Sequence, residues 1–160
     1  MPNRRHFDQR AKIKYAQNVA NGTRLSLLIV DVDHFKSVND HYGHDKGDEY
    51  LRSIAATLSD VLARHVGGVA RYGGEEFICL LPDTDAAKAR AIAEAMRRAV
   101  EAARLPNETV TPPWVTISIG VATLLHGDPG LPGLLKQADV QLYRAKQQGR
   151  NRVCTTIIGK

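Results

Sequence analysis

The sequence contains a nearly continuous apolar run, Leu25 to Val32, whose last positions are rich in β-branched residues. Runs of this kind form strands that are covered on both faces, so the segment predicts a central strand of a sheet flanked by helices. Successive side chains of a strand point to opposite faces. Asp31 and Asp33 are therefore expected to share one face at the end of this strand. Val30 and Val32 are expected on the other face.

Helical and strand-like patterns alternate along the rest of the chain. Apolar residues recur at helical spacing over about residues 5–20, 46–64, 85–104 and 131–148, with a shorter helical turn around 37–40. Strand-like runs cover residues 69–72, 77–81, 115–123 and 152–158, the first two around a glycine pair. This order is a split βαβ pattern. It predicts an α+β fold, in one domain of residues 1–160, with a mostly antiparallel, ferredoxin-like central sheet flanked by helices.

Two acidic clusters lie far apart in the chain. Asp31 and Asp33 close the first strand, and Glu75 and Glu76 follow the glycine pair. In a split βαβ sheet the first and third strands are antiparallel neighbours, so the two clusters are expected to meet at one sheet edge. Carboxylates suit Mg²⁺, which takes one or two of them plus substrate phosphates, so this edge is a candidate site for one or two metal ions and a triphosphate. The alternative is a hairpin turn that carries solvated acids.

Composition constrains partners and compartment only slightly. The chain has 22 Lys and Arg against 17 Asp and Glu, a net charge of +5, which favours phosphate-bearing partners. Cys79 and Cys154 lie in apolar runs, where a thiol acts as a small hydrophobe of a reducing compartment. No apolar run is long enough to cross a bilayer. The cysteines and the short apolar runs favour a soluble, cytoplasmic fragment with no membrane contact, and no nucleic-acid partner is expected.

Several short motifs follow one another in an order that resembles a known family. They are Asn3-Arg4-Arg5, Asp31-Val32-Asp33-His34-Phe35-Lys36 with Asn39-Asp40, Gly43-His44-Asp45 through Gly47-Asp48, Gly73 to Phe77, Thr116 to Val121, and Ala138-Asp139 through Gly149-Arg150-Asn151. In these motifs the chain resembles the GGDEF domain of the diguanylate cyclase family, as a GGEEF variant, over essentially its whole length. The resemblance implies a fold like the palm of nucleotidyl cyclases and polymerases.

The resemblance also implies an activity and a set of catalytic acids. Two GTP molecules would condense to cyclic di-GMP and two pyrophosphates, by metal-assisted attack of a 3′-hydroxyl on an α-phosphate across a two-fold dimer. Asp31, Glu75 and Glu76 are expected to be catalytic. Asp31, Glu75 and the backbone carbonyl of Val32 are expected to hold Mg²⁺ or Mn²⁺. Glu76 would help to bind a second ion or activate the 3′-hydroxyl, and Asp33 is expected to be structural.

Nucleotide contacts follow from the same resemblance. Asn39 and Asp48 match the guanine-binding residues, and a carboxylate can accept hydrogen bonds from N1–H and the 2-amino group of guanine. Without the resemblance, Asn39 could equally be a helix cap and Asp48 an acid of a first helical turn. The expected phosphate contacts are Phe35, Lys36, Gly73, Gly74, Lys146 and Arg150. The last two, taken alone, are typical of cations that compensate a helix dipole.

The chain departs from the family pattern in two places. Family members subject to product inhibition carry an Arg-x-x-Asp motif just before the glycine pair, whereas this chain keeps Arg64 but has Gly67 at the aspartate position. Ala95 stands where a helix arginine completes such a site, so the allosteric inhibitory site is predicted to be degenerate, although product could still compete at the active site. The usual Asp-x-Leu-Thr motif upstream of Asn3 is missing, so we expect a catalytic fragment of a longer, sensor-linked protein.

Three other functions share part of this pattern. A catalytically silent GGDEF-like domain could act as a receptor for GTP or cyclic di-GMP, but the intact Asp31, Glu75 and Glu76 disfavour it. A polymerase-like or adenylyl-cyclase-like nucleotidyltransferase is disfavoured by Asp48 and by the full Gly73 to Phe77 motif. A glycosyltransferase with a sugar nucleotide at Asp31 and Asp33 has no further support. The leading hypothesis requires two protomers, each with one GTP, so a transient homodimer with low intrinsic activity is expected.

Overall fold

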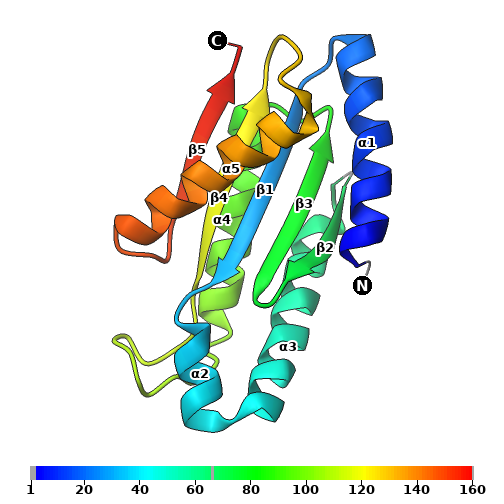
Figure 1. The fold of residues 1–160 in the computed structure, drawn as a ribbon. Helices are drawn as coiled ribbons and strands as arrows, with labels where there is room; N and C mark the ends of the chain where they lie inside the picture. The colour runs from blue at the N-terminus through cyan, green and yellow to red at the C-terminus, as the bar shows by residue number, and fades with distance from the viewer. Residues whose placement is uncertain (1–2, 66, 160) are drawn as a thin grey trace.

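The computed structural model describes residues 3–65 and 67–159, which contain five helices and five strands (Figure 1). The helices are α1 (Arg4–Asn21), α2 (Phe35–Tyr42), α3 (His44–Leu62), α4 (Ala86–Ala102) and α5 (Gly130–Gln147). The strands are β1 (Leu25–Val32), β2 (Gly68–Gly73), β3 (Glu76–Pro82), β4 (Ile117–Leu124) and β5 (Val153–Ile158). None of the described helices is long and apolar enough to cross a membrane.

The strands form one sheet with the order β2-β3-β1-β4-β5. β1 runs antiparallel to both of its neighbours, β3 and β4, and only the β4–β5 pair is parallel. The first four strands thus have the split βαβ arrangement, with β1 and β3 side by side at its centre. The α+β fold class and the mostly antiparallel sheet expected from the sequence are confirmed.

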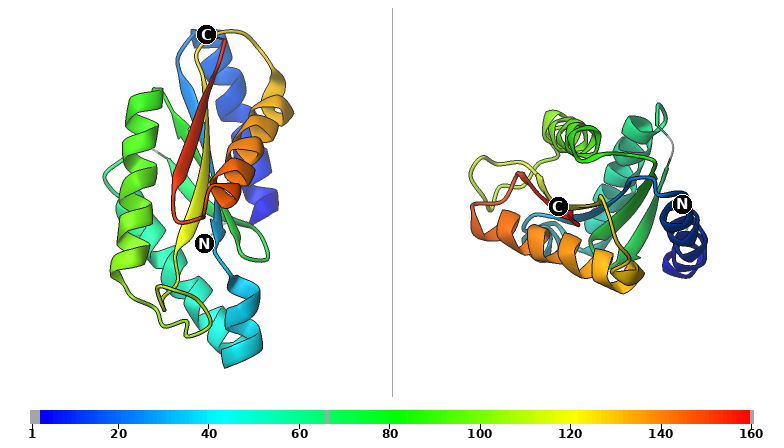
Figure 2. Two further views of the ribbon diagram at one scale, coloured as in Figure 1. Left: turned by 90° about the vertical axis from the view of Figure 1, so that its left-hand side faces the viewer. Right: turned by 90° about the horizontal axis from the view of Figure 1, so that it is seen from above.

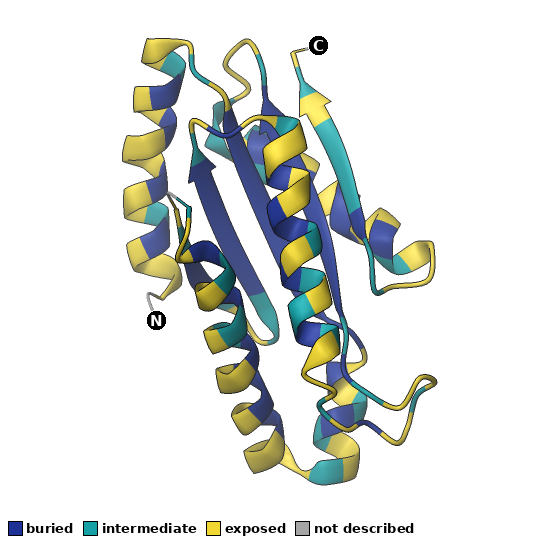
Figure 3. Ribbon diagram, turned by 180° about the vertical axis from the view of Figure 1, so that it is seen from behind, coloured by how far each residue is buried: buried dark blue, intermediate teal, exposed yellow. Residues whose placement is uncertain are grey.

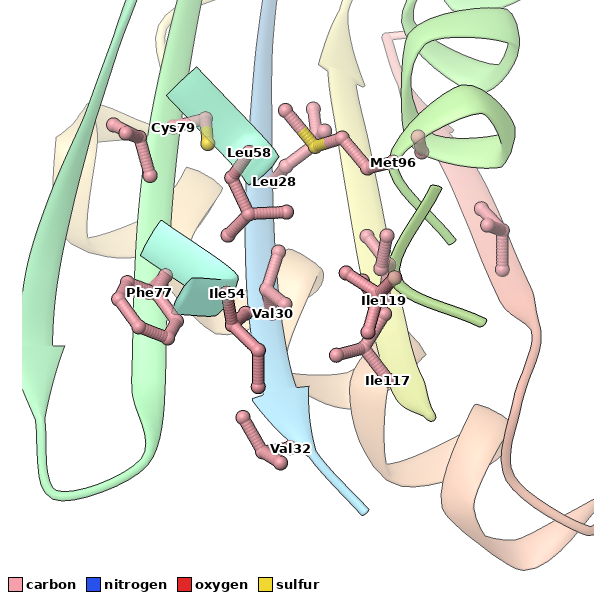
Figure 4. Packing of buried hydrophobic residues seen from close by; sticks show 14 of the residues in the cluster. Leu28, Val30, Val32, Ile54, Leu58, Phe77, Cys79, Met96, Ile117 and Ile119 are labelled. Atoms are coloured by element: carbon pink, nitrogen blue, oxygen red, sulfur yellow. The ribbon is translucent and has the colours of Figure 1, made fainter. Parts of the chain in front are cut away.

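Helices cover both faces of the sheet, as Figure 2 shows. Every residue of β1 is buried, which the continuous apolar run predicted. Figure 3 shows the central strands buried and the outer surfaces of the helices exposed, whereas the edge strand β5 is only partly buried. Leu28, Val30 and Val32 pack toward α3 and α4 in one hydrophobic cluster (Figure 4). Leu27 and Ile29 belong to a second cluster with residues of α1 and α5. Burial of each such side chain contributes about 1.5–3 kcal/mol to the stability of the fold. β1 therefore stabilises the packing of helices on both faces of the sheet.

The segment after β1 differs from its expected form. The sequence predicted only a helical turn around residues 37–40, but α2 is eight residues long. His34 adopts a left-handed conformation with φ 55°, and its carbonyl accepts a hydrogen bond from Ser37 N at 3.0 Å, so the chain turns sharply into α2. Gly43, with φ 92°, then separates α2 from α3, which begins at His44 rather than near residue 46. The two helices lie against each other at the end of β1.

The fourth strand also starts later than expected, at Ile117 rather than residue 115. The preceding residues follow a different pairing, because Trp114 bridges to Pro106 and Val115 N donates to the carbonyl of Leu105 at 2.8 Å. The segment expected to be a plain loop after α4 therefore folds back along the start of β4. This arrangement places Thr116 and Ser118 beside the end of β1.

Candidate active site

The end of β1 lies beside the turn of the β2–β3 hairpin. Asp31 is the register partner of Glu76, and Val32 N donates to the carbonyl oxygen of Glu75 at 3.2 Å. Gly74 occupies the turn with φ 22°, a conformation that favours glycine. The structure therefore brings together the two acidic clusters that the strand order predicted to meet.

Arg71 holds this turn in place. Its Nε and Nη2 atoms both donate to the carbonyl oxygen of Gly74, at 3.1 and 2.7 Å. Two hydrogen bonds from a planar guanidinium to one acceptor restrict the turn that presents Glu75. The sequence pattern predicted no role for Arg71.

Asp31 is a buried carboxylate whose two oxygens have different surroundings. Oδ2 forms an ion pair with Lys146 of α5, whereas Oδ1 is buried and accepts no hydrogen bond from any described residue. Burial raises the pKa of Asp31 above its ordinary value, the bond and charge of Lys146 lower it, and the charges of Glu75 and Asp33 raise it further. A buried oxygen of this kind is costly unless a cation or donor reaches it. Oδ1 of Asp31 is therefore suited to a metal ion.

Asp33 is equally buried but fully satisfied. Its carboxylate accepts hydrogen bonds from Thr116 Oγ1 at 2.7 Å, Ser118 Oγ at 2.6 Å and Asn151 N at 3.0 Å. Protein donors therefore occupy the oxygens that a metal would need. Asp33 joins β1, β4 and the loop after α5, which agrees with the structural role expected for it.

Glu75 and Glu76 face different cavities. Glu75 lines a cavity of about 330 Å³ between the hairpin, α2 and α3. Glu76 lines another, on the side of α5, together with Asp139 and Lys136. Burial, followed by the charge of Asp31, raises the pKa of Glu76. The two adjacent glutamates thus have distinct environments, which the sequence reasoning did not anticipate.

The cavity at Glu75 contains most of the expected nucleotide-binding residues. Its lining residues are Phe35, Lys36, Asn39, Asp48, Leu51, Arg71, Gly74 and Glu75. Asn39 comes from α2 and Asp48 from α3, so the α2–α3 pair places two candidate guanine-binding side chains across one hollow. Leu51, on the buried face of α3, adds an apolar wall. A flat base with polar edges fits a mixed lining of this kind.

Gly47 leaves room for the side chain of Asn39. A Cβ atom at Gly47 would overlap Oδ1 of Asn39 and lie 3.1 Å from Cζ of Phe35. Only glycine therefore lets α3 approach α2 closely enough for Asn39 to stay in place. Asn39 is not the capping residue of α2, since His34 precedes that helix.

The expected phosphate-binding cations are spread around the same end of the sheet. Lys36 lines the cavity, is highly exposed and pairs with Asp40 at 3.7 Å. Lys146, near the end of α5, reaches Asp31. Arg150 is exposed in the loop that follows α5 and has φ 64°. Lys146 therefore borders the site from the side of α5, and Asn151 N, which donates to Asp33, brings the loop that carries Arg150 beside the end of β1.

The residues in place of the inhibitory motif lie elsewhere. Arg64 is exposed just after α3, and Ala95 is exposed on α4. Gly67 has φ 148°, and a Cβ there would lie 2.8 Å from Cδ2 of Leu81 and 2.9 Å from the carbonyl oxygen of Leu80. An aspartate could not take this position without a shift of the backbone.

The donor set around Asp31 fits a hard divalent cation that also binds phosphate. In residues 3–65 and 67–159 no group of three or more His, Cys, Asp or Glu side chains could form a metal cage. Mg²⁺ does not need one, because it usually takes one or two carboxylates and completes its shell with water and substrate phosphates. Asp31, the Val32 carbonyl and Glu75 could supply such a partial shell, with Oδ1 of Asp31 free to take part.

Comparison with known proteins identifies the family. The family model for "Diguanylate cyclase, GGDEF domain" matches residues 1–152. The chain belongs to this family. The GGDEF domain is 43% identical to diguanylate cyclase DgcM of Escherichia coli K12 over 151 residues, which cover 94% of this chain and 35% of DgcM. It is also 42% identical to diguanylate cyclase A of Treponema denticola over 131 residues, 81% of this chain and 34% of that protein. The chain therefore spans about a third of the length of these relatives.

Solved structures agree with the fold of the GGDEF domain. The active GGEEF domain of a diguanylate cyclase from Vibrio cholerae has a TM-score of 0.87 and 34% identity, with 96% of both chains covered. The GGDEF domain of DgcB from Caulobacter crescentus, solved in complex with c-di-GMP, has a TM-score of 0.84 and 34% identity over 96% of this chain and 90% of that one. Both similarities extend across the helices and strands that form the candidate site.

Proposed function

We propose that this GGDEF domain is a diguanylate cyclase, which converts two GTP molecules into cyclic di-GMP and two pyrophosphates. The observation that carries the proposal is the unpaired, buried Oδ1 of Asp31 beside a hairpin whose Glu75 opens into the Asn39–Asp48 cavity. A cation site and a base-sized hollow with complementary polar groups thus lie next to each other. The diguanylate cyclase relatives, and the c-di-GMP complex of DgcB, support this assignment.

In this proposal the guanine base of GTP occupies the cavity between α2 and α3. Asp48 accepts hydrogen bonds from N1–H and the 2-amino group, and Asn39 contacts the remaining polar edge. Adenine lacks this pair of donors, so the same cavity would reject ATP. Leu51 and Phe35 provide the apolar contacts that a base requires.

The triphosphate extends from the base toward the end of β1. Lys36, Lys146 and Arg150 supply positive charge there, and the backbone N–H groups of Phe35, Gly73 and Gly74 are additional donors. Lys146 now neutralises Asp31 and would turn to the phosphates when a cation takes over that role. The proposal therefore gives Lys146 one partner in the free domain and another in the nucleotide complex.

Mg²⁺ or Mn²⁺, when bound, would supply charge stabilisation for the α-phosphate and the leaving pyrophosphate. The chain would hold it through Asp31, Glu75 and the carbonyl of Val32. Glu76 faces the other cavity, and its raised pKa makes it a better proton acceptor than an exposed carboxylate. We therefore assign to Glu76 the activation of the attacking 3′-hydroxyl, or a contact to a second ion.

Two protomers must face each other, since each would present one GTP to the other. The proposed rate is consequently second order in protein at low concentration. Fusion to a dimerising coiled coil should raise the rate per protomer. A rate that is first order in protein, and unchanged by the fusion, would contradict the two-protomer mechanism.

The proposed function is tested by incubating the domain with GTP and Mg²⁺ and identifying products by mass. Cyclic di-GMP and pyrophosphate are the expected products, and Asp31→Ala and Glu75→Ala should abolish them. Asp60→Ala, an exposed acid at the far end of α3, is the matched control and should leave the activity unchanged. GTP binding without any product would contradict the cyclase and indicate a silent receptor.

A further inference from the structure

The loop after α5 has an unusual backbone. Gly149, Arg150 and Asn151 all have positive φ, at 122°, 64° and 47°. Glycine adopts such values at little cost, but consecutive left-handed residues with side chains are rare. A strained conformation persists only where the surrounding structure holds it. Contacts outside the loop must therefore fix the backbone of Arg150.

Asn151 makes these contacts with all of its donor groups and its side-chain oxygen. Its backbone N–H donates to Oδ2 of the buried Asp33 at 3.0 Å. Its side-chain amide donates to Oε2 of Glu101 at 2.9 Å, and its side-chain oxygen accepts from Nη1 of Arg97 at 3.0 Å. The end of β1 and helix α4 together thus hold the residue that follows Arg150.

Arg97 is held between two carboxylates of its own helix. Its side chain is only 17% exposed and lies between Glu94, with Nη2 to Oε2 at 3.1 Å, and Glu101, with Nη1 to Oε1 at 3.4 Å. Glu101 also accepts from Nε1 of Trp114 at 3.3 Å. Because the two carboxylates fix the plane of the guanidinium, its hydrogen bond to Asn151 has a fixed direction.

The same loop is joined to the end of α5. Arg150 N donates to the carbonyl of Ala145 at 3.0 Å, one residue before Lys146. Asp33, at the other end of the network, lies two residues after Asp31. The contacts of Asn151 therefore connect Arg97, which lies on α4 outside the candidate site, to the loop of Arg150 beside that site.

We propose that Arg97 is a positioning residue for nucleotide binding: through Asn151 it holds Arg150 in the orientation that contacts the phosphates of GTP. This inference rests on the proposed function, because Arg150 is a phosphate contact only there. Arg97 has no part in binding the base, since its partners lie on α4 and in the loop after α5. Its loss should therefore weaken binding of phosphate-bearing ligands and spare guanosine.

The test compares Arg97→Gln with Arg98→Gln, its neighbour on α4. Arg98 is a matched control because it is 76% exposed and pairs with Glu94 at 3.8 Å. The probes are the α,β-methylene analogue of GTP with Mg²⁺, measured by calorimetry, and guanosine, measured by ligand-observed NMR. Arg97→Gln should weaken binding of the analogue about tenfold, the order expected for one charge-assisted hydrogen bond, and change guanosine binding less than about twofold. Arg98→Gln should change neither.

Two results would overturn the inference. One is analogue binding by Arg97→Gln within about twofold of the wild type, and the other is an equal loss for guanosine, which would indicate general damage. If Arg97→Gln does not fold, Arg97→Lys keeps the charge without the planar donor pair and should show a smaller loss of the same selectivity.

A double variant separates positioning from an independent effect. In an Arg150→Ala background, Arg97→Gln should weaken analogue binding by no more than about twofold, because its target is already gone. A full tenfold loss in that background would contradict the inference while leaving the proposed function intact. A wild-type domain that binds the analogue no more tightly than guanosine would overturn the phosphate contacts, and with them both proposals.

Discussion

Replacing Asp31 by Asn is expected to stabilise the metal-free domain while abolishing its activity. The ionised carboxylate is buried, its Oδ1 accepts no hydrogen bond, and its pKa stays above the ordinary value despite Lys146, chiefly because of burial. An unsatisfied buried group costs about 1–3 kcal/mol and a charged one costs more, so a neutral amide of the same shape removes the part of this cost that is due to the charge. Lys146 loses its partner, but its side chain is 35% exposed and can turn to water, so this loss is about 0–1 kcal/mol.

The net gain is therefore about 1 kcal/mol, which corresponds to a rise in melting temperature of about 2–4 °C for a domain of this size. The matched control is Asp33→Asn, the same substitution at a carboxylate that accepts three hydrogen bonds. At position 33 the amide NH2 of Asn would face a hydrogen-bond donor. The free energy of unfolding should therefore drop by about 1.5–3 kcal/mol, and the melting temperature should fall with it. Calorimetric melting of both variants without metal checks these opposite signs.

Two results would refute this reasoning. The first is a lower melting temperature for Asp31→Asn than for the wild type without metal. The second is a rise in melting temperature on addition of Mg²⁺ and the GTP analogue that is equally large for Asp31→Asn and for the wild type. Ligand binding to the folded state stabilises it by mass action, so only a chain that still binds the cation should show the full rise.

The pH dependence of stability follows from the same carboxylate. A raised pKa means that the folded state holds the proton of Asp31 more tightly than the unfolded chain does, so stability of the metal-free domain falls as pH rises through that pKa. Glu76 acts with the same sign. Asp31→Asn should show a shallower fall over the acidic range, measured by denaturant unfolding. An identical pH profile in the variant would contradict the raised pKa.

Three further predictions concern the nucleotide cavity and the inhibitory motif. Gly47→Ala should weaken binding of the GTP analogue without unfolding the domain, because the new Cβ overlaps Asn39; unchanged affinity would contradict the placement of Asn39. Asp48→Ala should lower kcat/KM for GTP about 10- to 100-fold and remove any preference over inosine triphosphate, which lacks the 2-amino group; a surviving preference would exclude Asp48 as its source. Arg64→Ala should leave inhibition by cyclic di-GMP unchanged, and weaker inhibition would reveal a working product site.

The central part of the fold was predictable from the sequence because its signals are local and unambiguous. A short continuous apolar run with turn residues at both ends is typical of a buried strand. β1 was therefore expected at Leu25 to Val32, where it occurs. α2 was underestimated because its start depends on the left-handed conformation of His34, which few non-glycine residues adopt. A pattern of apolar spacing contains no information about such a turn.

The site was predictable as far as strand order determines it. Antiparallel pairing of β1 and β3 places the backbone of Asp31 opposite that of Glu76, independently of the side-chain conformations. The ion pair of Asp31 with Lys146, and the separation of Glu75 from Glu76 into two cavities, depend on how far α5 extends across the sheet and on how the hairpin turn closes. These are tertiary properties, and the network around Asn151 is another, since it joins three segments distant in sequence.

The central claim is that Asp31 and Glu75 hold one cation together with the nucleotide. A titration of Mn²⁺ into the domain in the presence of the α,β-methylene GTP analogue measures cation binding directly, with the EPR signal of unbound Mn²⁺ as the readout. We predict at least one bound Mn²⁺ per protomer, strongly weakened binding in both Asp31→Asn and Glu75→Gln, and no change in Asp60→Asn. Equal Mn²⁺ affinity in all four proteins would contradict the claim.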